Sequence, residues 1–176
     1  MSIATNLHGR LRNTSLPWGC GLLPVFEAVG NAIHAIEDAG LPTASGRIKV
    51  EILRDVQEGF EFEGERKKPG PEAKGDIRAF KITDNGIGFT DENMTSFMTL
   101  DSEYKANRGG RGVGRLLWLK AFRHARISSV YHDAEGTARL RRFRFGPENG
   151  VTDEPTEDDP GSTRSTTVHL DGFVDR

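Results

Sequence analysis

The sequence has almost no cysteine and no long apolar run. Cys20 stands alone among 176 residues, which excludes an intramolecular disulfide and a cysteine-based zinc site and favours a reducing, cytoplasmic environment. The longest stretch without Asp, Glu, Lys or Arg is Asn13–Phe26. Its 14 residues include two prolines and fall short of the ~20 apolar residues of a membrane span. We therefore expect no membrane anchoring.

The sequence also has no large excess of positive or negative charge. Lys and Arg number 24 against 26 Asp and Glu, so the formal net charge is −2. This balance excludes a strongly basic nucleic-acid module and a highly charged disordered tail. The length fits one domain, residues 1–176, with a core large enough to need no disulfide or structural metal.

Glycine, in contrast, is abundant, at 21 of 176 residues or about 12%, where about 7% is usual. The glycines that bear on function gather in two segments, Thr83–Gly88 (TDNGIG) and Gly109–Gly114 (GGRGVG). Each segment adjoins a regular element. Glycines placed in this way let the backbone approach a ligand closely.

Apolar patterning predicts helices across Leu22–Ala39 and Val113–Phe122, and Asp91–Met98 can form a short helix. In the first, apolar residues recur every three or four positions and form one stripe: Leu22, Phe26, Val29, Ile33 and Ile36. Alternation predicts strands across Arg47–Val56, Ile77–Thr83, Arg126–Tyr131, Thr137–Phe145 and Ser165–Leu170.

The polar segments Gln57–Gly75, Thr99–Arg111 and Pro147–Ser162 are expected to be loops. His8 is expected in a non-helical stretch. Helices followed by mostly antiparallel strands indicate an α+β protein, a two-layer sandwich with a mixed, mostly antiparallel sheet and helices on one face. The lack of strict strand–helix alternation argues against a doubly wound parallel sheet.

Glu27 and Asn31 lie four residues apart in the first predicted helix, which places their side chains on one face. An amide oxygen can bind a divalent cation while a neighbouring carboxylate polarises a water, a pairing that suits nucleotide hydrolysis. The alternative is two polar residues on the solvent side of an amphipathic helix.

Asp84 ends an apolar strand and precedes Gly86 and Gly88, so we expect its carboxylate at a sheet edge, facing whatever the turn admits. A carboxylate accepts a hydrogen bond from the amino group of adenine and not from the carbonyl of guanine. The two glycines would leave room for a purine ring. The alternative is a plain Asx-Gly turn between strands.

Gly109–Gly114 leads into a predicted helix, and a glycine-rich turn there presents free N–H groups and the positive end of the helix dipole to phosphates. The alternative is a flexible hinge. A P-loop is excluded, because Arg115 and Leu116 stand where Lys and Ser or Thr are needed. A dinucleotide fingerprint is excluded by the GxGxG spacing and the polar segment before it.

These segments, in this order, resemble the boxes of the GHKL ATPases, the family of gyrase, heat-shock chaperone, histidine kinase and MutL proteins. Phe26–Ala35 is similar to the N box with its ExxxN pattern, Asp84–Gly88 to DxGxG, and Gly109–Gly114 to GxxGxG. Thr166 resembles the threonine of the last motif, although Ser165 stands where glycine often precedes it. The resemblance spans nearly the whole chain and implies the Bergerat nucleotide-binding fold.

The resemblance also implies roles. Glu27 would be the general base, Asn31 the Mg²⁺ ligand, and Asp84 the adenine reader with Thr166 behind it. Gly86 and Gly88 would lie at the nucleotide, as would the lid across Phe89–Arg111. The phosphate contacts implied for the lid segment and the turn after it are Lys105, Gly110, Gly112, Val113 and Gly114. ATP and Mg²⁺ are the implied ligands, with ADP as product.

The form of the glycine box resembles chaperone, MutL and MORC-type members more than histidine kinases. In such proteins a basic residue of a downstream domain completes hydrolysis, so we expect the N-terminal module of a longer protein, slow alone and forming nucleotide-dependent homodimers. Two alternatives remain: a non-catalytic interaction scaffold, and nucleic-acid binding through Arg139, Arg141, Arg142 and Arg144. For these arginines, an exposed strand face is the competing explanation.

Overall fold

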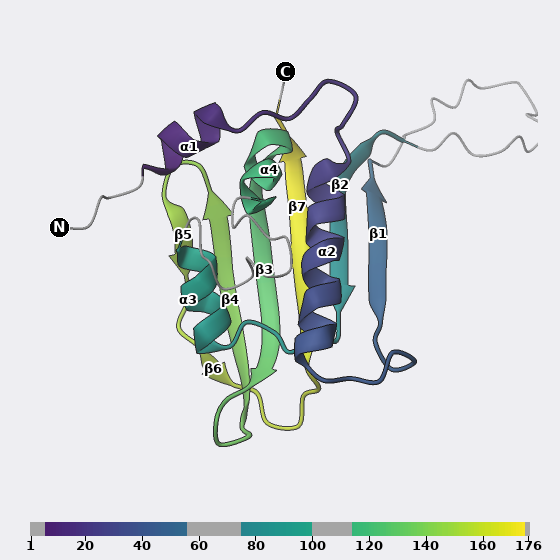
Figure 1. Ribbon diagram of the computed structural model, residues 1–176, viewed down its shortest axis with the longest axis vertical. Helices are drawn as coiled ribbons and strands as arrows, with labels where there is room; N and C mark the ends of the chain where they lie inside the picture. The colour runs from purple at the N-terminus through teal and green to yellow at the C-terminus, as the bar shows by residue number, and fades with distance from the viewer. Residues whose placement is uncertain (1–5, 56–74, 100–113, 175–176) are drawn as a thin grey trace, which may run out of the picture.

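The computed structural model describes residues 6–55, 75–99 and 114–174. Within these ranges, seven strands form one sheet and four helices accompany it (Figure 1). The expected α+β class is confirmed. All strand pairs among the described residues are antiparallel, so the expectation of a mixed sheet is wrong.

The sheet has the order β1-β2-β7-β3-β4-β5, and β6 also pairs with β4. The strands are β1 (Ile48–Arg54), β2 (Ile77–Asp84), β3 (Phe122–His132), β4 (Ala138–Gly146), β5 (Gly150–Asp153), β6 (Glu157–Asp158) and β7 (Ser165–Phe173). The helices are α1 (Leu7–Asn13), α2 (Leu23–Asp38), α3 (Asp91–Met98) and α4 (Gly114–Ala121). Figure 1 shows α2, α3 and α4 across one face of the sheet, with β1 at its margin. None of the helices described is long and apolar enough to cross a membrane.

Two expectations about local structure are wrong. The acidic segment Pro147–Ser162 contains β5 and β6, because its backbone completes the pairing of β4. His8 lies in α1, whose first turn is capped by the side chain of Asn6, which accepts a hydrogen bond from the Gly9 N–H. Of the predicted loops, residues 57–74 and 100–111 lie outside the described residues.

The predicted stripe packs against the core only at Val29, and the fully buried face of α2 is a different one. It consists of Pro24 and the small side chains of Val25, Ala28 and Ala32. Leu22, Phe26 and Ile33 are exposed instead. Small residues let a helix lie close to a sheet, so the larger apolar residues of α2 are displaced to one flank.

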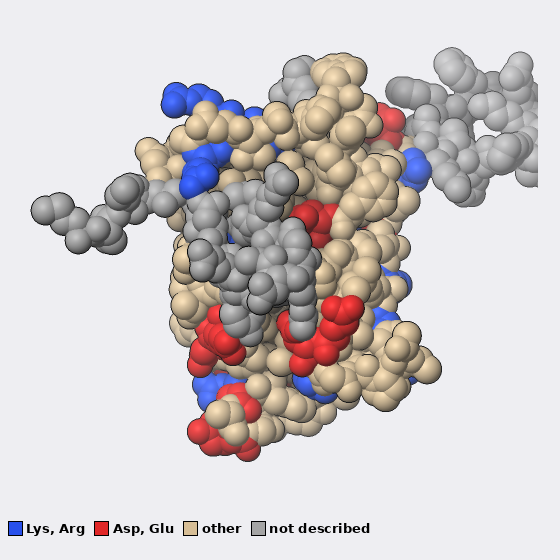
Figure 2. Space-filling model, in the orientation of Figure 1, with Lys and Arg blue, Asp and Glu red and all other residues tan. Residues whose placement is uncertain are grey.

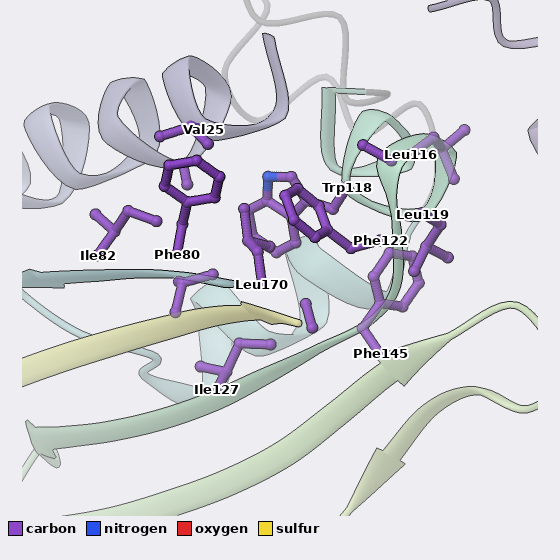
Figure 3. Packing of buried hydrophobic residues seen from close by; sticks show 14 of the residues in the cluster. Val25, Phe80, Ile82, Leu116, Trp118, Leu119, Phe122, Ile127, Phe145 and Leu170 are labelled. Atoms are coloured by element: carbon purple, nitrogen blue, oxygen red, sulfur yellow. The ribbon is translucent and has the colours of Figure 1, made fainter. Parts of the chain in front are cut away.

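The hydrophobic core fills the space between the helices and the sheet (Figure 3). Phe80, Ile127 and Leu170 of the sheet meet Val25 of α2 and Leu116 of α4 in this layer. Burial of such side chains is the main source of stability for the fold and fixes α2 and α4 over the strands.

Candidate functional site

Four buried polar side chains form one row across the helix-facing side of the sheet. Asp84 of β2 is paired with Thr166 of β7, which is paired with Ser129 of β3, which is paired with Arg141 of β4. Their exposed fractions are 6%, 4%, 0% and 7%. The adjacent row is entirely apolar: Ile82, Val168, Ile127 and Phe143. The hydrophobic core therefore ends at a row of polar side chains. Of these four residues, only Asp84 and Thr166 are expected at a ligand site from the sequence.

Asp84 is the last residue of β2, which lies between β1 and β7. The carboxylate is therefore at the end of an inner strand, not at a sheet edge as expected. Its Oδ1 accepts a hydrogen bond of 2.8 Å from the Gly86 N–H, so the Asx turn of the alternative interpretation is present. Burial nevertheless raises the pKa of Asp84 to about 6, although the hydrogen bond from the Gly86 N–H lowers it. A plain surface turn would not desolvate its carboxylate in this way.

The segment after Asp84 is held on two sides. The Ile87 N–H donates to the Ala35 carbonyl of α2 at 2.8 Å, and the Phe89 N–H donates to Ser129 Oγ at 2.9 Å. Ser129 Oγ also bonds Thr166 Oγ1 at 2.9 Å. The segment thus bridges α2 and the polar row of the sheet.

Both glycines of this segment are required by packing. A Cβ atom at Gly86 would lie 2.5 Å from the backbone carbon of Ala35. Gly88 has φ of +83° and a Cβ there would lie 2.9 Å from Ser129 Oγ. The space that these glycines leave is therefore filled by the protein itself, in addition to any role toward a ligand.

Arg141 is buried and does not lie on an exposed strand face, one of the two explanations that the sequence left open. It points toward the helices and donates to the Phe89 carbonyl and to Asp91 Oδ1, each at 2.6 Å. Its guanidinium lies 5.0 Å from the ring centre of Tyr131. Arg141 therefore anchors the start of α3 to β4.

The arginines of β4 do not form one exposed face, because alternate residues of a strand point to opposite sides. Arg139 and Arg141 point to the side that carries the helices. Arg139 pairs with Asp133 and Asp158, and Arg142 pairs with Glu157. This arrangement weakens the nucleic-acid alternative.

The flank of α2 that faces α4 carries Glu27, Asn31 and Ala35, each one turn after the last. At one end, a Cβ atom on Gly114, the first residue of α4, would overlap the carboxylate of Glu27. At the other end, Ala35 contacts Gly86. Segments far apart in the sequence therefore meet on one side of one helix.

Asn31 lies between these two contacts. Its Nδ2 donates to Glu27 Oε1 at 3.5 Å, a long hydrogen bond, which turns the amide nitrogen toward Glu27 and leaves Oδ1 as the available ligand atom. Glu27 and Asn31 are both half-buried, so they do not lie on a fully solvated face.

In the part of the chain that the structure describes, no cluster of three or more His, Cys, Asp or Glu side chains could hold a metal. A Mg²⁺ ion would depend on Asn31 and on oxygens of a ligand, an arrangement typical of Mg²⁺ at nucleotides. Lys105, Gly110, Gly112 and Val113 lie outside the described residues.

A scan against models of protein families finds no match to this chain, and a search of curated protein sequences finds none either.

The glycine segment provides a test of its packing. Gly86→Ala should destabilise the fold by about 1–3 kcal/mol, because the added methyl group meets the backbone of Ala35. Gly30→Ala is the matched control, since nothing lies within 4 Å of a Cβ there and alanine favours the interior of α2. Urea unfolding measures both. Equal stability of the two variants would contradict the bridge between Gly86 and α2.

Burial of Asp84 predicts a pH dependence. The raised pKa means that the folded state binds a proton more tightly than the unfolded state, so stability falls as the pH rises from about 4 through 6. Each pKa unit is worth about 1.4 kcal/mol. Asp84→Asn should therefore stabilise the fold by up to about 3 kcal/mol at pH 8, with little effect at pH 4.

Urea midpoints at several pH values measure this difference, with the exposed Asp76→Asn as control. A gain for Asp84→Asn that is the same at pH 4 and pH 8 would show that ionisation of the buried carboxylate is not its cause.

Proposed function

We propose that this chain is a GHKL-type ATP-binding module with the Bergerat fold, which hydrolyses ATP slowly with Mg²⁺ and acts as a nucleotide-driven switch. The observation that carries the proposal is the convergence along one flank of α2. Glu27 lies against Gly114 at one end of this flank. Ala35 lies against Gly86 at the other end, and Asn31 lies between them. The described residues of three segments that resemble the family's motifs, namely Glu27 and Asn31, Gly86, and Gly114, therefore lie along this one flank.

Asp84 would recognise the adenine base. Its ionised carboxylate accepts a hydrogen bond from the exocyclic amine, whereas guanine would present a carbonyl oxygen to it. Thr166 is paired with Asp84 in the sheet, and a hydrogen bond to Ser129 holds its hydroxyl. A desolvated carboxylate gains more from an amine partner than one in water, which supports a recognition role.

The phosphates would lie at the α4 end of the α2 flank. Gly114 opens α4, where free N–H groups and the helix dipole favour anions. Asn31 Oδ1 would hold Mg²⁺ together with phosphate oxygens, and the ion would neutralise the charge that develops there. Glu27 would polarise the attacking water, since its carboxylate lies directly at the start of α4.

The lid residues complete the proposal. Lys105, with the backbone N–H groups of Gly110, Gly112 and Val113, would contact the phosphates. Contacts to the γ-phosphate would order the lid, expose a dimerisation face and release it after hydrolysis to ADP. Arg141, which ties the Phe89–Asp91 segment to β4, gives the start of this lid a fixed anchor.

Nucleotide binding tests the role of Asp84. Calorimetric titration with a non-hydrolysable ATP analogue and Mg²⁺ should give binding to the wild type and a loss of roughly 10- to 100-fold in affinity for Asp84→Asn. The GTP counterpart should bind weakly to the wild type. Because Asp84→Asn is also expected to stabilise the fold at pH 8, lost binding cannot be ascribed to unfolding. Absence of binding to the wild type would overturn the proposal.

Hydrolysis tests the role of Glu27. Glu27→Ala should reduce steady-state phosphate release by about 10²-fold or more while nucleotide affinity changes little, because a general base acts on the chemical step. Glu37→Ala, in the last turn of the same helix, is the control and should keep the wild-type rate. Unchanged turnover in Glu27→Ala, with binding intact, would favour the interaction scaffold instead.

A further inference from the structure

The flank of α2 opposite to Glu27 and Asn31 is apolar and open. Phe26 and Ile33 are 63% and 46% exposed. Ile36 belongs to the same stripe and lies against Gly46, where a Cβ atom would be 2.6 Å from Ile36 Cγ2. Gly46 lies two residues before Ile48, the first residue of β1. The apolar flank of α2 therefore faces the side of the molecule on which β1 lies.

β1 continues this apolar surface. Val50 and Ile52 are paired with the core residues Ile82 and Phe80 of β2, so they point to the helix side of the sheet. They are nevertheless 45% and 51% exposed. Figure 1 shows no helix in front of β1, and Figure 2 shows mostly uncharged surface beside α2. None of the described helices or strands covers the surface formed by Val50 and Ile52.

The outer edge of β1 is unpaired in the described sheet, because β1 is the terminal strand of its order. Edge strands are often protected by charged residues or proline. β1 has no proline, and its first five residues read Ile48-Lys49-Val50-Glu51-Ile52, in which the charged residues Lys49 and Glu51 flank Val50. This segment is chemically symmetric about Val50, except that the two charges on either side of it are opposite. Opposite charges at those positions would attract across an antiparallel pair of identical strands.

We propose that β1 pairs antiparallel with β1 of a second copy of this chain, with Val50 opposite the partner's Val50. In this register Lys49 lies opposite the partner's Glu51, and Ile48 lies opposite the partner's Ile52. The ion pair within one chain, Lys49 Nζ to Glu51 Oε1 at 2.9 Å, becomes part of a group of four alternating charges. The dimer is isologous and closed, so the edges do not extend into a fibre.

The symmetry axis of such a pair is perpendicular to the sheet, so the helices of both copies lie on the same face. The two β2 strands are then three strand spacings apart, about 14 Å. Directly packed helices are about 8–10 Å apart. The two α2 helices are therefore too far apart to pack directly, and a gap remains between them above the paired β1 strands. This gap would be filled by Val50 and Ile52 of both copies and by the exposed apolar side chains of both α2 helices. This interface does not depend on nucleotide binding and lies across α2 from the proposed ATP site.

Charge reversal tests the register. Wild type should show concentration-dependent dimers in sedimentation equilibrium. Lys49→Glu and Glu51→Lys should each weaken dimerisation about tenfold or more, because each places like charges opposite one another twice. The double variant Lys49→Glu/Glu51→Lys should restore it. An equimolar mixture of the two single variants should form heterodimers, since their strands are complementary.

Cross-linking tests the axis. In a Cys20→Ser background, Val50→Cys should form an intermolecular disulfide under mild oxidation, because facing Cα atoms lie about 4.5–5.5 Å apart. Ile48→Cys is the matched control. It would lie roughly 13 Å from its own counterpart and should not cross-link.

Circular dichroism of each variant, with the same cooperative melting as the wild type, ensures that every chain is folded. A wild type that is monomeric throughout the concentration series would overturn the proposal. Dimers that persist unchanged in both single variants, or equal cross-linking of Val50→Cys and Ile48→Cys, would also overturn it.

Discussion

The candidate site depends on one buried carboxylate, that of Asp84, at the end of an inner strand. No cation pairs with it among the contacts of the described residues, and its hydrogen bond from Gly86 does not offset the loss of solvent, so its pKa is raised. Groups whose pKa is shifted by burial are concentrated at functional sites. The surrounding contacts hold it in place: Ser129 and Thr166 complete the row, and the Ile87 N–H fixes the following segment to α2.

Helix α2 separates two surfaces because its three sides differ in chemistry. Val25, Ala28 and Ala32 are buried against the sheet. One flank carries Glu27 and Asn31 toward α4, and the opposite flank carries large apolar side chains toward β1. The small buried residues make this possible, since a helix that buried its largest side chains would have no apolar flank to expose. The proposed nucleotide site and the proposed β1 interface therefore lie on opposite flanks of α2.

Much of the secondary structure could be predicted because alternation and helical periodicity are local signals. The bounds of α3 and most of β2 follow from the sequence. The buried side of α2 could not be predicted, because Phe26 and Ile33 give a stronger hydrophobic signal than alanines, although the alanines fit the close approach to the sheet. The contacts of Arg141 could not be predicted either, because its partners, Phe89 and Asp91, are about fifty residues away and only the sheet register brings them together.

In the candidate site too, some residues could be related from nearby sequence, whereas others are related only through the pairing of distant strands. Glu27 and Asn31 could be related from their spacing alone, and Asp84 from the turn that follows it. Ser129 carries no motif, and only the register of β3 with β7 and β4 places it between Thr166 and Arg141. Yet its hydroxyl is what joins the glycine segment to the row, through Phe89 and Thr166. Residues that would touch a ligand can thus be recognised by type, whereas the residue that positions them is identified by its hydrogen bonds.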